Sequence, residues 1–190
     1  MEELLHNLSL IHPLSPGVIE YFRIHLKTRK LHKKDFLLKI GRVSEEIFFI
    51  NQGLIRCFYL IDDKEVSSWF MKEGDVMISV ESFFKQSISY EAIQAVEDSV
   101  VHYITYLELQ HLYKNFSEFN FIGRVLTERY YTLSEERLHS IRFKSARKKY
   151  AHLMKNHPEL ILRVPSKYLA SYLGINEVTL SKIKGDVQIY

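Results

Sequence analysis

The sequence predicts an α+β protein: an antiparallel β-roll, or jelly roll, comes first, one long helix follows, and helices joined by a sharp turn end the chain. Three observations support this. Short apolar segments recur between residues 35 and 105, an uninterrupted helical pattern starts near residue 118, and a helix–glycine–helix pattern occupies residues 166–183. The expected parts are a β-roll with flanking helices at residues 1–116, the long helix at residues 117–145 and C-terminal helices at residues 146–190.

Six segments carry the β signal, after an amphipathic helix predicted at residues 16–31. Each is rich in β-branched and aromatic residues, and Gly, Asn or Asp residues stand between them as turn signals. The predicted strands are residues 35–40, 46–51, 54–61, 66–71, 88–96 and 100–105. Because no long helix separates them, we expect antiparallel pairing in a sandwich or barrel.

Helical patterns follow at residues 106–116, from residue 118 to about residue 145, and at residues 146–156 before Pro158. The long middle helix carries apolar side chains at separations of three, four and seven. These residues are Phe119, Ile122, Leu126 and Leu133. We expect this stripe to pair with the same helix of a second chain. The alternative is a helix that packs only on its own β-roll.

Residues 166–183 have the spacing of a helix-turn-helix. Two matching apolar faces are formed by Leu169, Leu173, Leu180 and Ile183. Ala170 is small enough to let the two helices cross closely. Gly174 suits the left-handed conformation at the end of the first helix, and Asn176 is a good N-cap for the second.

The outer face of the second helix is polar, although packing does not require this. In a helix-turn-helix, that face meets base edges in the major groove of DNA. The predicted DNA contacts are Ser166, Lys167, Asn176, Glu177, Val178, Thr179, Ser181, Lys182 and Lys184. An ordinary helical hairpin is the alternative interpretation.

The charge distribution favours DNA binding. Residues 137–190 contain 11 Lys and Arg against 3 Asp and Glu, whereas residues 1–136 contain 15 against 20. A basic module suits contact with phosphate, whose neutralisation dominates affinity for DNA. The alternative is a solvated basic helix surface, formed by Arg142, Lys144, Arg147, Lys148 and Lys149.

Composition argues against several other classes of protein. No stretch of about 18 apolar residues exists and the N-terminus is acidic, so we expect a cytoplasmic protein without a membrane span. Cys57 is the single cysteine, and the nine histidines lack metal-ligand spacing. No catalytic or nucleotide-binding motif is present. We therefore expect no enzyme activity, no metal and no resident cofactor.

Several short motifs, taken in this order, resemble a known superfamily. They are Gly41 before Ile47–Ile50, then Gly53–Arg56, Glu73–Asp75, Tyr168–Ile175 and Leu180–Ile183. With the predicted β-roll, long helix and helix-turn-helix, they are similar to the cyclic-AMP receptor/fumarate-nitrate regulator (Crp/Fnr) superfamily. The resemblance implies a sensor domain like cyclic-nucleotide-binding domains, a homodimer that binds double-stranded DNA, and RNA polymerase as a further candidate partner.

The phosphate-binding cassette departs from this resemblance. Relatives that bind cyclic nucleotides carry an Arg followed by Ser or Thr there, whereas residues 74–95 contain no Arg and have Ser89-Tyr90 at that place. Burial of a phosphodiester without a charge partner costs several kcal/mol, so we expect that cyclic AMP is not the effector. Either a less charged effector binds a pocket lined by Ser79, Ser82, Ser89 and Tyr90, or side chains such as Phe83 and Phe84 fill the region.

The leading hypothesis is a dimeric, sequence-specific transcriptional regulator. The alternative is an effector-sensing or protein-interaction module in which the helix-turn-helix only packs. A third, weaker hypothesis is an enzyme on a cupin-like barrel, which needs metal-binding histidine pairs on facing strands, but the β region offers only His102.

Overall fold

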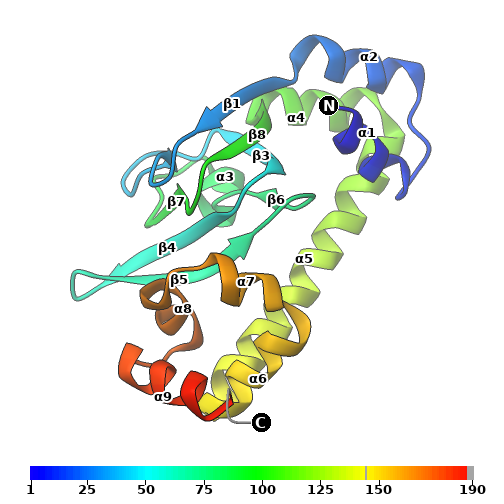
Figure 1. The fold of residues 1–190 in the computed structure, drawn as a ribbon. Helices are drawn as coiled ribbons and strands as arrows, with labels where there is room; N and C mark the ends of the chain where they lie inside the picture. Colours follow the sequence, from blue (N-terminus) through cyan, green and yellow to red (C-terminus); the bar gives the residue numbers. More distant parts are fainter. Residues whose placement is uncertain (144, 188–190) are drawn as a thin grey trace.

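The computed structural model describes residues 1–143 and 145–187, and Lys144 and the last three residues lie outside them. Two four-stranded antiparallel sheets form the β-roll, in the orders β1-β8-β3-β6 and β2-β7-β4-β5 (Figure 1). The strands are β1 (Lys27–Leu31), β2 (Phe36–Leu38), β3 (Glu46–Gln52), β4 (Ile55–Ile61), β5 (Lys64–Met71), β6 (Val76–Met77), β7 (Glu91–Ala95) and β8 (Ser99–Thr105). The prediction of an antiparallel β domain is confirmed.

The two sheets enclose an apolar core. Ile50, Ile55, Ile93 and Val101 are fully buried between them, and Phe48 is nearly so. Side chains of alternate strand residues point inward, which is why the β-branched residues of these strands predicted the sheets correctly. The core gives the β-roll a rigid frame for the loops and helices around it.

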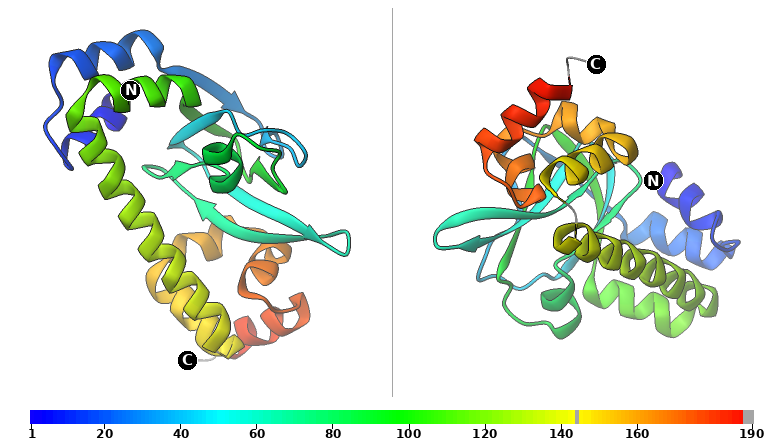
Figure 2. Two further views of the ribbon diagram at one scale, coloured as in Figure 1. Left: turned by 180° about the vertical axis from the view of Figure 1, so that it is seen from behind. Right: turned by 90° about the horizontal axis from the view of Figure 1, so that it is seen from below.

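Four helices pack together at one end of the roll (Figure 2). They are α1 (Glu2–Ser9), α2 (Pro16–His25), α4 (Tyr106–Asn115) and the first half of α5 (Ser117–Phe143). The buried residues between them include Val18, Phe22 and Leu112. A capping box at the start of α4, made by Thr105 and Glu108, explains why the last strand turns directly into a helix.

The predicted helix at residues 16–31 is wrong in its second half. The helix ends at His25, and Leu26 adopts an extended backbone conformation. Residues 27–31 then form β1, which pairs with β8. This strand has polar side chains on its exposed face and only Leu31 buried, so its sequence carried little β signal.

Short elements account for the other differences from prediction. The helices α3 (Val80–Lys85) and α7 (Pro158–Arg163), together with β6, contain too few residues to show a period. The predicted strand at residues 88–96 begins only at Glu91. Among the described residues, no helix is both long and apolar enough to span a bilayer.

The long helix α5 runs diagonally from the N-terminal helices to the C-terminal ones (Figure 1). The chain then turns back through α6 (Ala146–Asn156), α7, α8 (Ser166–Leu173) and α9 (Glu177–Val187). Ser145 caps α6, because its hydroxyl accepts a hydrogen bond from the Lys148 amide at 3.4 Å. The C-terminal helices therefore fold back against the β-roll.

Candidate nucleic-acid interface

The helices α8 and α9 share an apolar core with α6. The five predicted packing residues are all buried, namely Leu169, Ala170, Leu173, Leu180 and Ile183. Tyr150 and Leu153 of α6 belong to the same cluster. The predicted packing is confirmed. The opposite face of α9 is exposed.

The turn between α8 and α9 has the predicted chemistry. Gly174 has a φ of 64° and ψ of 41°, a left-handed conformation that costs most residues free energy. The Ile175 amide donates to the Ala170 carbonyl at 3.1 Å. Asn176 caps α9, since its Oδ1 accepts a hydrogen bond from the Thr179 amide at 2.7 Å. These contacts fix the direction in which α9 leaves the turn.

Most of the predicted DNA-contacting residues lie together on the outer surface of α8 and α9. The exposed ones are Ser166, Lys167, Asn176, Glu177, Val178, Ser181 and Lys182. Val178 is 65% exposed and is the one apolar side chain in this set. Thr179 and Lys184 are half-buried, and the Lys184 ammonium donates to Ser166 Oγ at 3.2 Å, so it links the two helices.

The helix α8 also packs against β5 of the β-roll. The Ser171 hydroxyl donates to Ser67 Oγ at 3.2 Å and accepts from the Ser67 amide at 3.2 Å. Tyr172 meets Phe70 edge-on with ring centroids 5.2 Å apart. Leu54, Phe70 and Val96 of the β-roll join the apolar cluster of the C-terminal helices. The β-roll and the C-terminal helices are therefore in direct contact.

Two arginines reinforce this contact by stacking on tyrosines of α8. Arg56 is buried, and its guanidinium lies 4.0 Å from the ring centre of Phe58 and 3.6 Å from that of Tyr168. It donates to Gln94 Oε1 at 2.6 and 3.0 Å and to Glu65 at 2.7 Å. Arg137 of α5 stacks on Tyr172 at 3.6 Å, and burial lowers its pKa. Such stacking is a property of the planar guanidinium.

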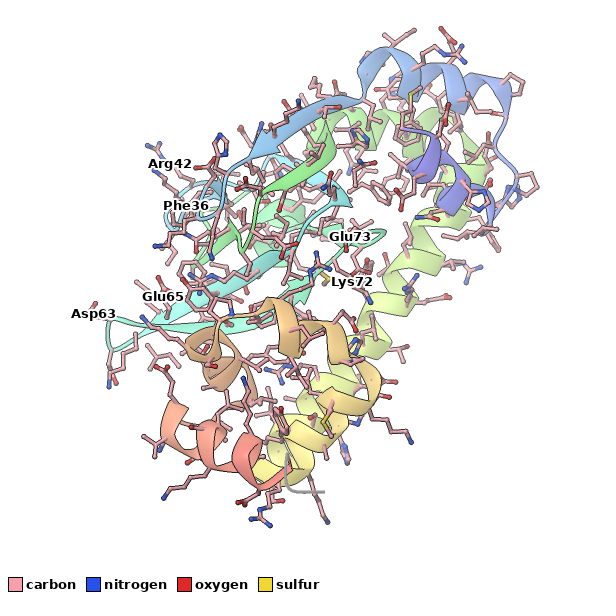
Figure 3. All side chains as sticks on the ribbon, viewed as in Figure 1. Phe36, Arg42, Asp63, Glu65, Lys72 and Glu73 are labelled. Atoms are coloured by element: carbon pink, nitrogen blue, oxygen red, sulfur yellow. The ribbon has the colours of Figure 1, made fainter. Side chains whose placement is uncertain are left out.

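Ion pairs close the edge of the same contact. Arg163 of α7 donates to Glu73 at 2.8 and 2.9 Å and to Glu97 at 2.5 Å. Its guanidinium holds the pKa of Glu73 at about 2. Lys72 bonds Glu159 of α7 at 2.5 Å, and Figure 3 shows Lys72 and Glu73 on the side of the roll that faces this helix. No sequence signal could have paired these residues, because they come from distant segments.

The three serines of the predicted effector pocket are buried, and their hydroxyls are bonded to protein atoms. Ser79 Oγ lies 2.9 Å from Ser89 Oγ and donates to Glu91 at 3.1 Å. Ser82 Oγ donates to the Ser87 carbonyl at 2.5 Å. Phe83 is fully buried beside them, as expected if side chains fill this region.

Two predicted members do not lie with the buried serines. Tyr90 is 58% exposed, whereas Ser79, Ser82 and Ser89 are buried. Phe84, named as a side chain that fills the region, is half exposed. Both Ser89 and Tyr90 lie before β7 begins at Glu91, so no strand alternation sets the direction of their side chains.

The structure contradicts the first two members of the predicted dimer stripe on α5, whereas Leu133, the last member, is half-buried and its role in a dimer stays a prediction. Phe119 and Ile122 are buried within the protomer, among residues of the N-terminal helices and β-roll, and are not available to a second chain. Leu126 packs on the same cluster. Among the described side chains of α5, the exposed apolar ones are Phe121 near its start and, in its second half, Tyr131, Leu138 and Ile141, which follow one another at separations of seven and three.

His102 and Cys57 of the β-roll contact only protein groups among the described residues. His102 lies 2.9 Å from the N-terminal amine and 2.9 Å from Thr28 Oγ1. Cys57 is buried, and burial raises the pKa of its thiol. Within residues 1–143 and 145–187, no three His, Cys, Asp or Glu side chains are grouped as metal ligands.

Solved structures share this fold at low sequence identity. No model of a known protein family matches the chain, and no curated protein does. FixK2 from Bradyrhizobium japonicum is 15% identical with a TM-score of 0.77, over 86% of this chain and 85% of that one. A CooA mutant from Carboxydothermus hydrogenoformans is 20% identical with a TM-score of 0.72, over 97% and 84%.

A third structure, the c-di-GMP-responsive global regulator CLP from Xanthomonas campestris, is 17% identical with a TM-score of 0.70, over 92% of each chain. A structure from Eubacterium rectale, described as a candidate Crp/Fnr transcriptional regulator, is 16% identical with a TM-score of 0.74, over 97% and 88%. The chain therefore has the fold of Crp/Fnr regulators, as its resemblance implied.

Proposed function

We propose that this chain is a Crp/Fnr-type transcriptional regulator that binds DNA as a homodimer and recognises a specific sequence. The observation that carries the proposal is the exposed polar face of α9, held on a buried core and an Asn176-capped turn. It belongs to a region with 11 basic and 3 acidic residues. Glu177, Val178 and Lys182 are exposed on this face, and each matches a feature of a base edge.

The proposed mode places α9 in the major groove. Glu177 accepts from a cytosine amino group, Lys182 donates to guanine or phosphate, and Val178 contacts a thymine methyl. Ser166 and Lys167, at the start of α8, contact the phosphate backbone and position the helix. This division gives α9 the sequence preference and α8 a large share of the affinity.

The exposed apolar stripe in the second half of α5 supports dimerisation. Tyr131, Leu138 and Ile141 repeat at the seven- and three-residue separations of a coiled coil. A two-fold dimer through this face presents two copies of α9, so the operator is a two-fold symmetric site with half-sites roughly one DNA turn apart. We place the protein in the cytoplasm, where DNA is accessible, with RNA polymerase as a candidate further partner.

Cyclic AMP is not the proposed effector. The place of a cassette arginine is taken by Ser89, whose neighbour Ser79 donates to the carboxylate of Glu91 at 3.1 Å. A carboxylate there repels a cyclic phosphate instead of compensating its charge. Phe83 and the mutually bonded serines occupy the region with protein atoms.

A second candidate function is an effector-sensing or interaction module that uses α8 and α9 only for packing. The contact of α8 with β5, through Ser171 and Ser67, favours it. That contact, however, leaves the outer face of α9 exposed and unused.

DNA-binding measurements separate the two functions. The purified protein is titrated with fragments of its own promoter region and with scrambled fragments across a salt series. The double variant Glu177→Gln, Lys182→Ala should lose sequence preference and bind the preferred fragment at least roughly tenfold more weakly. Lys155→Ala, a matched change on the exposed surface of α6, should stay within about twofold, since it removes at most one phosphate contact. Equal binding of all fragments would rule out the regulator.

A further inference from the structure

A cavity of about 240 Å³ lies where the β-roll meets the start of α8. Its lining residues are Lys33, Lys34, Ala95, Val96, Pro165, Lys167 and Tyr168. Three of these are lysines and none is acidic. The lysines come from two distant parts of the chain, the loop between β1 and β2 and the first turn of α8, so only the docked arrangement brings them together.

The three ammonium groups have no anionic partner among the described residues. Lys33 donates only its backbone amide, to Asp98 at 2.8 Å, and Asp98 does not line the cavity. Lys34 and Lys167 are exposed and form no ion pair within the part of the chain that the structure describes. Three like charges around one hollow repel each other unless an anion enters.

The walls of the cavity are fixed before any ligand binds. The Lys34 amide donates to the Ala95 carbonyl at 2.9 Å, and its carbonyl accepts from Gln94 at 3.0 Å. These bonds hold Lys34 at a φ of 77°, a conformation that is uncommon for lysine. Tyr168 is held from behind by Arg56, which also bonds Gln94. One chain of contacts therefore joins both sides of the cavity.

We propose that this cavity binds a small anion that carries phosphate groups, in contact with Lys33, Lys34 and Lys167. Three cations provide the charge that a multiply charged phosphate needs. The volume is below the usual range of small-molecule sites, roughly 300 to 1,000 Å³, which favours a compact anion over a dinucleotide. The start of α8 adds to the attraction, because no side chain caps its first amides.

A bound anion bridges the β-roll to α8. Lys33 and Lys34 belong to the sensor side, and Lys167 belongs to the helix that precedes the turn into α9. A ligand that contacts both sides stabilises the docked arrangement over any in which α8 leaves β5. The site thus couples the concentration of a phosphate compound to the position of the C-terminal helices, separately from the serine region of the β-roll.

Calorimetry with inorganic pyrophosphate tests the site without DNA. The full-length protein in low-salt chloride buffer should bind one pyrophosphate per chain and melt at a higher temperature with ligand. The triple variant Lys33→Ala, Lys34→Ala, Lys167→Ala should bind at least roughly a hundredfold more weakly. The control variant Lys30→Ala, Lys114→Ala, Lys155→Ala removes the same charge from exposed sites elsewhere and should bind within about threefold of the wild type.

Two outcomes would overturn the proposal. One is a wild type without saturable pyrophosphate binding. If the triple variant then lowers only the salt dependence of DNA binding, Lys167 keeps the phosphate-backbone contact proposed above, Lys33 and Lys34 join it, and the anion site is removed. The other is an equal loss of pyrophosphate affinity in both triple variants, which would mean that binding depends only on the net charge of the protein. Pyrophosphate binding by a protein that does not bind DNA would leave this site standing and remove the proposed regulator function, so the two failures are distinguishable.

Discussion

At the scale of single residues, the turn between α8 and α9 depends on the backbone of Gly174. Its φ of 64° lies in the left-handed region, where a Cβ meets the following carbonyl oxygen. A Cβ built at this position finds only ordinary contact, with Lys149 Nζ at 3.6 Å. The penalty for a larger residue therefore comes from the backbone conformation and not from crowding.

Gly174→Ala should destabilise the protein by about 1 to 2 kcal/mol, measured as the free energy of unfolding in urea. Gly185→Ala is the matched control: this glycine lies inside α9 without positive φ, and no atom lies within 4 Å of its Cβ position. Alanine there should stabilise the helix by up to about 1 kcal/mol. Similar effects of both substitutions would contradict the left-handed turn.

At the scale of elements, α5 uses two different faces in its first and second halves. Phe119 and Ile122 contact the N-terminal helices and the β-roll, whereas Tyr131, Leu138 and Ile141 are exposed. The helical period by itself marks apolar residues without saying what covers them. The helix α5 is therefore amphipathic as expected, but the surface that covers Phe119 and Ile122 is formed by the N-terminal helices and β-roll of the same chain.

Leu138→Glu should convert a dimer to a monomer, because the charge would be buried in a coiled-coil contact. Light scattering after size-exclusion chromatography measures the mass directly. Leu162→Glu serves as the control, since this side chain on α7 is 87% exposed and lies outside the stripe. A Leu138→Glu protein that remains dimeric would place the dimer contact elsewhere.

At the scale of the whole molecule, the β-roll and C-terminal helices are held together by charges as well as by the apolar cluster. Arg163 joins α7 to Glu73 and Glu97 of the roll. The pKa of Glu73 falls from its ordinary 4.5 to about 2 in the folded protein. A folded pKa below the unfolded one adds stability that is complete above about pH 4.5 and is lost as the pH falls toward 2.

Glu73→Gln should therefore lower the free energy of unfolding at pH 7 by about 1 kcal/mol, a small value because the pair is partly solvated. It should also flatten the loss of stability between pH 4.5 and 2. Urea unfolding followed by fluorescence of the single tryptophan, Trp69 in β5, measures both effects. Glu81→Gln, at an exposed pair within α3, should change stability by less than about 0.5 kcal/mol and leave the acid profile unchanged. Identical profiles for the wild type and Glu73→Gln would contradict the assigned pair.

Local sequence patterns were sufficient to predict those elements that are stabilised by interactions between near neighbours in the chain. The turn at Gly174, the cap at Asn176 and the apolar faces of α8 and α9 follow from backbone conformation and helical period, and each is present in the structure. Most of the β-roll strands were predictable because their inward faces are β-branched and aromatic. The strand β1 was not, because pairing with β8 decides its conformation more than its own polar residues do.

The sequence by itself determined the class of fold, the α8–α9 turn and the outward face of α9. Only the tertiary structure decided which face of α5 remains exposed, how Arg56 and Tyr168 hold α8 against the roll, and that Lys33, Lys34 and Lys167 surround one cavity. The physical reason is the range of each interaction. Helical period and turn geometry act over a few neighbouring residues, whereas burial and charge pairing depend on which distant segments meet.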